Sequence, residues 1–287
     1  MRTKKACVIG TNVSNSLSPT IFQYWFDKYN INAEYGYIET KDEDFDKEIK
    51  SIFKKDGLCG LNVTTPYKER IISHLTKVDK HAAEIGAVNC VTINNNFVKG
   101  TNTDWVGFQD SLDYFEDNRG GEIKTKRDVA IVIGYGGSAK AIIYSLKKLH
   151  YKKIMVFNRT FEKIKNLKNT QGHNRNVVEP LKLEELPIKA PLANLVVNTV
   201  PDKKFIGQVV SYLRSNKDYR NKTNILGYDI VYKPETNFVR GFMSYNRIQG
   251  IYLLVHQAAP CFHRWFGVKP IIDQEIFKIL TGGGGHK

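Results

Sequence analysis

Short apolar runs and longer amphipathic stretches alternate along most of this chain. A short apolar run flanked by turn residues is typical of a buried strand, and apolar residues recurring about every three to four positions are typical of a helix. Regular alternation of the two predicts βαβ units and hence an α/β protein. Over the first hundred residues the pattern predicts strands at 6–10, 33–39 and 60–64, helices at 19–29, at 42–54 and after Pro66, and a hairpin with strands at 88–93 and 97–100.

A polar, glycine-bearing stretch at 116–127 is the clearest linker signal, and a second βαβ series follows it. A helix at 104–115 leads into this linker. The second series amounts to half or more of a doubly wound sheet, the architecture of Rossmann-like nucleotide-binding domains. Its expected strands are 129–133, 154–157, 195–198 and 225–228, and its expected helices are 138–149, 161–168 and 205–214.

The C-terminal part of the chain is predicted to be helical, with helices at 235–245, 250–266 and 270–280. We expect the last helices to return to the first domain, which makes that domain discontinuous in sequence. The predicted division is an N-terminal α/β domain, 1–104 with 250–287, and a Rossmann-like doubly wound domain at 105–249.

Composition adds few constraints. The 287 residues are 41% hydrophobic, enough for a core in each of two domains. No apolar run approaches the roughly 20 residues that cross a bilayer, and the N-terminus leads into a strand rather than a signal sequence, so we expect a soluble cytoplasmic protein. The widely spaced cysteines, without a C-x-x-C pair, indicate neither a zinc site nor a disulfide framework, and no metal is expected. They are Cys7, Cys59, Cys90 and Cys261.

The formal net charge of +14 raises the question of nucleic-acid binding, because basic proteins attract phosphate polyanions. The lysines are scattered, however, and pairs such as those at 54–55 and 147–148 are diluted by acidic residues. No nucleic-acid-binding motif accompanies them. We therefore expect neither nucleic acid nor a membrane as a partner, and a small anionic ligand instead.

A glycine-rich turn joins an expected strand to an expected helix. Gly134, Gly136 and Gly137, followed by Ser138 and Ala139, come directly after the apolar run at 129–133. This is the context of a nucleotide-binding loop, although the turn reads G-x-G-G rather than the full G-x-G-x-x-G, and such turns also occur without ligands. The turn makes a nicotinamide-linked dehydrogenase the leading hypothesis.

The end of the following strand indicates which nicotinamide cofactor is used. Arg159 stands where NAD-binding proteins usually carry an acid for the ribose 2′-hydroxyl, with Lys163 one helical turn later. An arginine at this position suits the 2′-phosphate of NADP. The competing interpretation is a surface arginine without a ligand.

Polar side chains also stand at the ends of strands in the first domain. Lys68 and Asp104 end two turn-rich stretches, and an ammonium and a carboxylate there can act as one proton-transfer unit on a substrate hydroxyl. Ser16 and Ser18 lie at an expected helix N-terminus, which can bind a carboxylate. Plain capping by Ser18 is the alternative. Asn62, Thr64, Asn89 and Asn102 complete a polar set suited to a polyhydroxylated ring.

Taken together, these stretches resemble the shikimate dehydrogenase family in order and spacing from about residue 8 to 267. The matching motifs are Ser-Leu-Ser-Pro at 16–19, Gly-Leu-Asn-Val-Thr-Thr-Pro-Tyr-Lys at 60–68, Gly-Ala-Val-Asn at 86–89, Asn-Thr-Asp-Trp-Val-Gly at 102–107, the glycine turn at 134–139 with Asn-Arg-Thr at 158–160, Asp-Ile-Val-Tyr-Lys-Pro at 229–234, and Val-His-Gln-Ala-Ala at 255–259.

The resemblance implies reversible NADPH-dependent reduction of 3-dehydroshikimate to shikimate, by a monomer or homodimer. It also implies residue roles, which are expectations here. Lys68 and Asp104 would be the catalytic pair; Ser16, Ser18 and Tyr232 would bind the substrate carboxylate; Asn62, Thr64, Asn89, Asp104 and Gln257 would bind the ring hydroxyls; Gly134, Gly136, Gly137, Ser138 and Ala139 would hold the pyrophosphate; Asn158, Arg159, Thr160 and Lys163 would hold the adenosine phosphate; Ile230 and Gly250 would flank the nicotinamide.

The chain departs from the family at two places. Phe22-Gln23 stands where the family usually has a His-Asn pair, and the run at 198–204 replaces the usual Asn-Ala-Thr followed by Gly-Met. The second departure lies near the expected cofactor site. Two alternatives therefore stay open: a quinate/shikimate dehydrogenase that uses NAD, and a catalytically silent NADP-binding protein that kept the scaffold.

Overall fold

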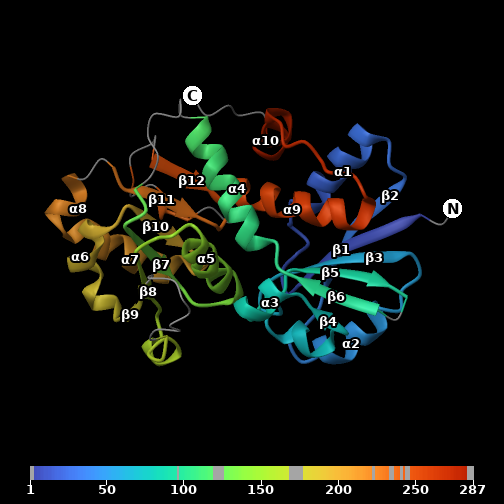
Figure 1. Cartoon of the computed structure of the whole chain (residues 1–287), viewed down its shortest axis with the longest axis horizontal. Helices are drawn as coiled ribbons and strands as arrows, with labels where there is room; N and C mark the ends of the chain where they lie inside the picture. Colours follow the sequence, from blue (N-terminus) through green and yellow to red (C-terminus); the bar gives the residue numbers. More distant parts are fainter. Residues whose placement is uncertain are drawn as a thin grey trace. The chain divides into compact units, whose positions relative to one another are not determined.

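The computed structural model describes residues 3–95, 97–118, 126–167, 177–221, 224–232, 236–239, 242 and 246–282. The chain forms two compact units, Met1–Gly107 with Leu254–Lys287, called unit 1 here, and Phe108–Leu253, called unit 2. The chain passes between them within two helices, α4 (Asp104–Asp117) and α9 (Gly250–Phe266) (Figure 1). Among the described residues, no helix has the length and apolar character of a membrane span.

Unit 1 contains a mixed six-stranded sheet. Its strand order is β2-β1-β3-β5-β6-β4, with β1 parallel to β2 and β3, and with β5 antiparallel to both β3 and β6. The carboxyl end of β3 therefore lies beside the start of β5, which leads by a hairpin to β6. The strands are β1 (Lys4–Gly10), β2 (Ala33–Glu39), β3 (Leu58–Val63), β4 (Lys77–Val78), β5 (Cys90–Asn94) and β6 (Phe97–Thr101).

Helices bury two apolar layers against this sheet. One layer is a cluster of buried aliphatic and aromatic side chains that includes Ile9, Phe45 and Leu61. The other is aromatic: the Phe22 ring stacks on Tyr35 with 4.0 Å between ring centroids. The helices of unit 1 are α1 (Ser18–Tyr29), α2 (Phe45–Ile52), the 3-10 helix η1 (Arg70–His74), α3 (Lys80–Ile85), most of α9, and α10 (Gln274–Leu280).

Unit 2 contains an all-parallel six-stranded sheet in the order β12-β11-β10-β7-β8-β9. The strand order reverses between β7 and β10. In doubly wound sheets, ligands bind outside the carboxyl ends of the strands at such a switch point. The strands are β7 (Val129–Ile133), β8 (Lys153–Phe157), β9 (Val177–Leu181), β10 (Leu195–Asn198), β11 (Leu226–Asp229) and β12 (Arg247–Gln249).

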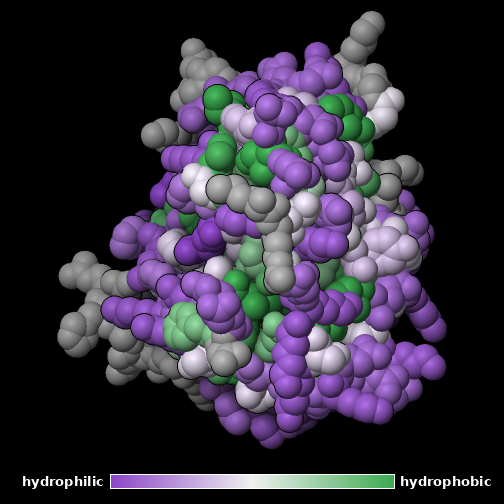
Figure 2. Space-filling view, turned by 90° about the vertical axis from the view of Figure 1, so that its right-hand side faces the viewer, coloured by the Kyte–Doolittle hydropathy of each residue, from purple (hydrophilic) through white to green (hydrophobic). Residues whose placement is uncertain are grey.

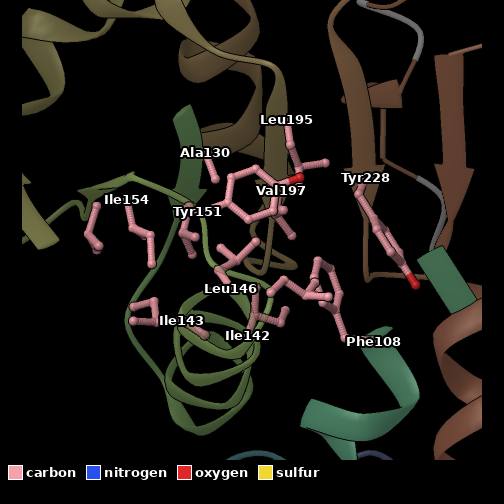
Figure 3. Close-up of a cluster of buried hydrophobic side chains, with 14 of the residues drawn as sticks. Phe108, Ala130, Ile142, Ile143, Leu146, Tyr151, Ile154, Leu195, Val197 and Tyr228 are labelled. Carbon is pink, nitrogen blue, oxygen red and sulfur yellow. The ribbon is translucent and has the colours of Figure 1, made fainter. Parts of the chain in front are cut away.

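The parallel sheet is buried by helices, as expected for strands that are apolar on both faces. Ile142 and Leu146 of helix α5 (Gly137–Lys148) pack against Ala130 and Val197 of the sheet in one buried cluster (Figure 3). A second cluster joins the sheet to α7 (Lys203–Ser215) through side chains that include Val209. The other helices are η2 (Phe161–Lys163), η3 (Leu183–Glu185), α6 (Leu186–Lys189), η4 (Ala190–Leu192) and α8 (Lys217–Asn221).

Hydrophilic residues predominate on the face shown in Figure 2, with hydrophobic residues in small groups among them. The exposed large apolar side chains come from separate elements; examples are Tyr37 of β2, Ile188 of α6 and Ile271 before α10.

The predicted α/β class with a Rossmann-like domain is confirmed. Several predicted helices are wrong in length. Where a helix was predicted at 161–168, the described residues 161–167 form only the three-residue 3-10 helix η2. The helix after Pro66 is the 3-10 helix η1, and the last helix begins at Gln274 because Asp273 caps it. The predicted helix at 235–245 lies largely outside the described residues. The elements β4, α3, β9, α6, α8 and β12 were not predicted.

Candidate active site

Lys68 and Asp104 form an ion pair in unit 1. The Lys68 Nζ lies 2.6 Å from Asp104 Oδ2, and the side chains are only 12% and 6% exposed. Lys68 follows β3, and Asp104 begins α4 just after β6. The two chain segments meet because β3, β5 and β6 are neighbours in the sheet. A buried pair of this kind holds a proton donor and a carboxylate at a fixed distance, which suits proton transfer.

Asn89 holds the second oxygen of the Asp104 carboxylate. Its Nδ2 donates to Asp104 Oδ1 at 2.7 Å, while its Oδ1 accepts from the Thr103 backbone N–H at 2.6 Å. The Asp104 N–H itself donates to the side chain of Asn102. Asp104 is therefore fixed at both carboxylate oxygens and at its backbone, so its orientation does not depend on a ligand.

Gln257 of α9 reaches the same cluster. Its Oε1 lies 3.2 Å from Asn89 Nδ2, and its Nε2 donates to the carbonyl of Leu254 at 2.8 Å. The structure thus brings together four of the predicted site residues from four stretches of sequence: Lys68, Asn89, Asp104 and Gln257.

Asn62 lies in the same unit, in β3, and is buried. Its Nδ2 donates to the Asn89 carbonyl at 3.1 Å and to Cys261 Sγ at 3.3 Å. Its Oδ1 accepts from the Tyr35 hydroxyl at 2.7 Å. Burial raises the pKa of Tyr35 well above its usual range, so this hydroxyl stays a donor. Thr64 follows β3 and is half-buried.

Ser16 and Ser18 stand at the start of α1, as predicted, but Ser18 does not cap the helix. The cap position is Leu17, and the Ser18 N–H donates to the Ser16 hydroxyl at 3.2 Å. Glu39 fixes the preceding loop, since its Oε1 accepts from the backbone N–H groups of Val13 and Ser14, both at 2.9 Å. The hydrogen bonds from Ser14 are the main reason that the Glu39 pKa is lowered.

In unit 2, the glycine turn lies at the carboxyl end of β7, next to the switch point. Gly134 has a φ of +106°, a conformation that L side chains rarely adopt, and a Cβ there would lie 2.3 Å from Thr199 Oγ1. Gly136 precedes α5, and no side chain in the described part of the chain caps the helix there. The backbone amides at the start of α5 and the helix dipole fit a pyrophosphate. Gly137 and Ser138 begin α5, and Ala139 is buried within it.

Asn158 and Arg159 follow β8 and line a pocket of about 340 Å³. Phe161, Lys182, Leu183, Glu184 and Gln208 complete its lining. Asn158 Nδ2 donates to the Thr160 carbonyl at 2.9 Å. Thr160 and Lys163 are exposed and are not among the lining residues. An exposed cation beside a pocket of this size fits the phosphate-bearing adenosine half of a dinucleotide.

Ile230 and Gly250 lie against each other in unit 2. A Cβ at Gly250 would come within 2.3 Å of the Ile230 carbonyl oxygen, so only glycine fits there without displacing the loop after β11. Tyr232 belongs to the same loop and is half-buried. Ile230, Tyr232 and Gly250 therefore form one local group at the carboxyl end of β11.

Four residues that make contacts at these sites were not named as site residues. Tyr35, Thr103 and Cys261 contact the polar cluster of unit 1, and Asp202 contacts Arg159. Cys261 follows Gln257 by one helical turn, so the period of α9 places both on one face and could have indicated the contact. Thr103 stands between Asn102 and Asp104 in the motif at 102–107, which could also have indicated it. The contacts of Tyr35 and Asp202 depend on pairings across the sheet or between loops, for which the sequence offers no local signal.

The features of the two units indicate the class of protein. Unit 2 has a parallel sheet with a glycine turn at its switch point, and unit 1 has a buried Lys–Asp pair among amide side chains. This is the construction of a two-domain nicotinamide-dependent dehydrogenase. In the described residues, no group of three or more His, Cys, Asp or Glu could hold a metal ion.

Comparison with known proteins identifies the family. Residues 8–91 match the shikimate dehydrogenase substrate binding domain, and residues 118–231 match the shikimate / quinate 5-dehydrogenase family. A shikimate dehydrogenase (NADP(+)) of Bartonella tribocorum is 34% identical over 281 residues, covering 95% of this chain and 91% of the relative. The chain belongs to the shikimate dehydrogenase family.

Solved structures of shikimate dehydrogenases are similar to this chain over nearly its whole length. The shikimate dehydrogenase of Aquifex aeolicus has a TM-score of 0.78 at 28% identity, covering 97% of each chain. A shikimate 5-dehydrogenase of Thermus thermophilus, solved in complex with NADP(H) and shikimate, has a TM-score of 0.76 at 26% identity, covering 96% of this chain and 98% of that one.

Proposed function

We propose that this chain catalyses the reversible, NADP-dependent reduction of 3-dehydroshikimate to shikimate, a step in the biosynthesis of chorismate and aromatic amino acids. The observation that carries the proposal is the 2.6 Å contact between Lys68 Nζ and Asp104 Oδ2 within a fixed network of amides. Membership of the family and the full-length similarity to NADP-dependent relatives support it.

Unit 1 is proposed to bind the substrate. Ser16 and Ser18, at the start of α1, would bind the substrate carboxylate through their hydroxyls, with Tyr232 as a further ligand. Asn62, Thr64, Asn89, Asp104 and Gln257 would bind the ring hydroxyls. The support is that Asn62, Asn89 and Gln257 are already tied into one hydrogen-bonded cluster with Asp104, so little ordering remains to be done when the ring binds.

Lys68 and Asp104 are proposed as the catalytic pair. In the direction of reduction, the Lys68 ammonium donates a proton to the carbonyl oxygen as hydride reaches the carbon. In the direction of oxidation, Lys68 takes the hydroxyl proton from shikimate. Asp104 accepts hydrogen bonds from Lys68 and Asn89, and it can also accept one from the substrate hydroxyl while it keeps Lys68 in position.

Unit 2 is proposed to bind NADP. The bound cofactor supplies or accepts the hydride, while the protein determines position. The backbone amides at the start of α5, with Gly134 and Ser138, would hold the pyrophosphate. Asn158, Arg159, Thr160 and Lys163 would hold the 2′-phosphorylated adenosine, and Ile230 and Gly250 would flank the nicotinamide. In this proposal 1–104 with 250–287 is the substrate domain and 105–249 the cofactor domain.

The proposed function is tested by assaying the purified protein for oxidation of shikimate and quinate with NADP⁺ and with NAD⁺, following the absorbance of the reduced cofactor. We expect turnover of shikimate with NADP⁺ to be the most efficient combination. Preferred turnover of quinate with NAD⁺ would identify the quinate/shikimate alternative, which the description of the matched family keeps relevant. Binding of NADP⁺ without turnover of either acid would identify a silent cofactor-binding protein.

The proposal includes a cytoplasmic location and a monomer or homodimer, because the reaction needs only small soluble reactants and every proposed substrate ligand comes from one chain. Sedimentation of the purified protein with and without NADP⁺ measures the oligomeric state. An assembly larger than a dimer would contradict this part of the proposal.

A further inference from the structure

Asp202 forms an ion pair with the arginine proposed to bind the 2′-phosphate. Arg159 Nη1 lies 2.8 Å from Asp202 Oδ2. The side chains are 69% and 41% exposed, so both reach the surface where a cofactor phosphate would approach. Asp202 belongs to the run at 198–204, in which the chain departs from the usual family pattern.

The position of the Asp202 carboxylate is fixed by α7. Asp202 caps this helix, and its Oδ1 accepts from the backbone N–H groups of Lys204 at 3.0 Å and Phe205 at 3.1 Å. These helix amides, that of Phe205 first, lower the pKa of Asp202, so the group is a carboxylate at neutral pH. One oxygen is used by the helix, and the other faces Arg159.

The Arg159 guanidinium also lies over the Phe205 ring, 6.0 Å from its centroid. Asp202 and Phe205 are thus neighbours of the same guanidinium. A cofactor phosphate that binds Arg159 has to share it with a carboxylate that cannot swing away without giving up its place at the helix terminus.

We propose that Asp202 is a specificity-determining residue that weakens the preference of this protein for NADP over NAD. The inference rests on the proposed function. A 2′-phosphate carries a charge of about −1.5 to −2, so it competes with the carboxylate for Arg159 and is repelled by it. NAD has only a hydroxyl at this position and does not experience the repulsion.

Asp202→Asn tests the proposal, since asparagine caps helices as well as aspartate but carries no charge. Dissociation constants of NADP⁺ and NAD⁺ are measured by calorimetric titration, with thermal unfolding as a check on the fold. We expect the NADP⁺ dissociation constant to fall about three- to tenfold, from the loss of a partly exposed competing pair and of the repulsion, and that of NAD⁺ to change less than about twofold. Adenosine 2′,5′-bisphosphate should reproduce the gain and 5′-AMP should not.

Asp128→Asn is the matched control. Asp128 is paired with Lys152 at 2.7 Å and lies just before β7, at the opposite end of this strand from the glycine turn. Asp128→Asn removes the same charge from unit 2. It should leave both dissociation constants within about twofold, because electrostatic interactions between exposed charges are screened over about 8–10 Å at ordinary ionic strength.

The outcomes separate the two proposals. Unchanged binding of NADP⁺ by Asp202→Asn would overturn the inference. Weaker binding would also overturn it, and would indicate that Asp202 holds Arg159 ready for the phosphate. Equal tightening of NADP⁺ and NAD⁺ would also overturn it. Failure of the unaltered protein to bind either dinucleotide would overturn the proposed function itself.

Discussion

Gly107 in α4 packs directly against the backbone of Gln257 in α9. A Cβ at residue 107 would lie 2.6 Å from Gln257 N and 2.8 Å from its Cα, closer than real Cβ atoms approach backbone. Gly107→Ala must therefore push the two helices apart in unit 1. We expect a loss of about 1–3 kcal/mol in the free energy of unfolding, as for other overpacked sites, and a higher KM for shikimate because Gln257 moves. Denaturant unfolding and steady-state kinetics measure the two effects.

Gly36→Ala is the control for this prediction. Gly36 lies in β2 of the same unit, and a Cβ there meets nothing within 4 Å. It should leave KM unchanged. An equal rise of KM in both variants would show that the close approach of Gly107 to Gln257 has no particular role.

Removal of the Lys68 ammonium should abolish most turnover without unfolding the protein. We expect Lys68→Ala to lower kcat roughly 10²- to 10⁴-fold, the usual contribution of a positioned proton donor. In this variant the Asp104 carboxylate still accepts a hydrogen bond from Asn89, and the Asp104 N–H still donates to Asn102, so the fold should survive. Circular dichroism and kcat, measured on the same preparation, test both halves of the prediction.

Lys80→Ala removes an exposed lysine from the first turn of α3 and serves as the comparison. Its kcat should be that of the unaltered protein. Near-normal turnover in Lys68→Ala would exclude Lys68 from proton transfer.

The strands were predicted best where they are continuous apolar runs. β7 has the predicted bounds because Val129–Ile133 is buried on both faces of a parallel sheet and the run is uninterrupted. β9 was missed because Glu179 and Pro180 interrupt its apolar pattern. Proline is tolerated there because β9 is the edge strand of the sheet, a position that the sequence does not reveal.

Some contacts of the candidate site could likewise be predicted from the sequence, and others could not. Lys68 and Asp104 could be paired from sequence because both end polar stretches that follow strands. The carboxyl ends of these two strands, β3 and β6, lie at the same end of the sheet. The contact of Tyr35 with Asn62 could not, because it depends on β1 separating β2 from β3 in the sheet. The Arg159–Asp202 pair joins two loops 43 residues apart and depends on the geometry of the switch point.

Arg159→Gln should weaken the binding of NADP⁺ more than that of NAD⁺. Charge-assisted hydrogen bonds contribute about 1.5–3 kcal/mol each, so we expect the NADP⁺ dissociation constant to rise about ten- to hundredfold and that of NAD⁺ to change little. Fluorescence titration with each dinucleotide measures the difference. Arg127→Gln is the control, because Arg127 precedes the amino end of β7 whereas Arg159 follows the carboxyl end of β8; it should change neither constant. Equal losses for both dinucleotides in Arg159→Gln would mean that Arg159 does not read the 2′-phosphate.

Asp46 should make part of the stability of unit 1 depend on pH. Its carboxylate in α2 accepts from Arg70 Nε at 3.0 Å and contacts His74 Nε2 at 2.7 Å, and these hydrogen bonds, that of Arg70 first, lower its pKa from 3.8 to about 2. A carboxylate whose pKa is lower in the folded state stabilises the fold above its unfolded pKa, and that contribution is lost as the pH falls from about 4 towards 2.

The test compares thermal unfolding of the unaltered protein and Asp46→Asn between pH 7 and pH 2. Asp46→Asn should be less stable at pH 7, and the difference should shrink as the pH falls through that window, because protonation removes the same charge from the unaltered protein. Glu84→Gln, which removes an exposed acid from α3, should run parallel to the unaltered protein. A constant difference between Asp46→Asn and the unaltered protein down to pH 2 would show that the ion pair with Arg70 does not stabilise the connection between α2 and the segment that follows Lys68.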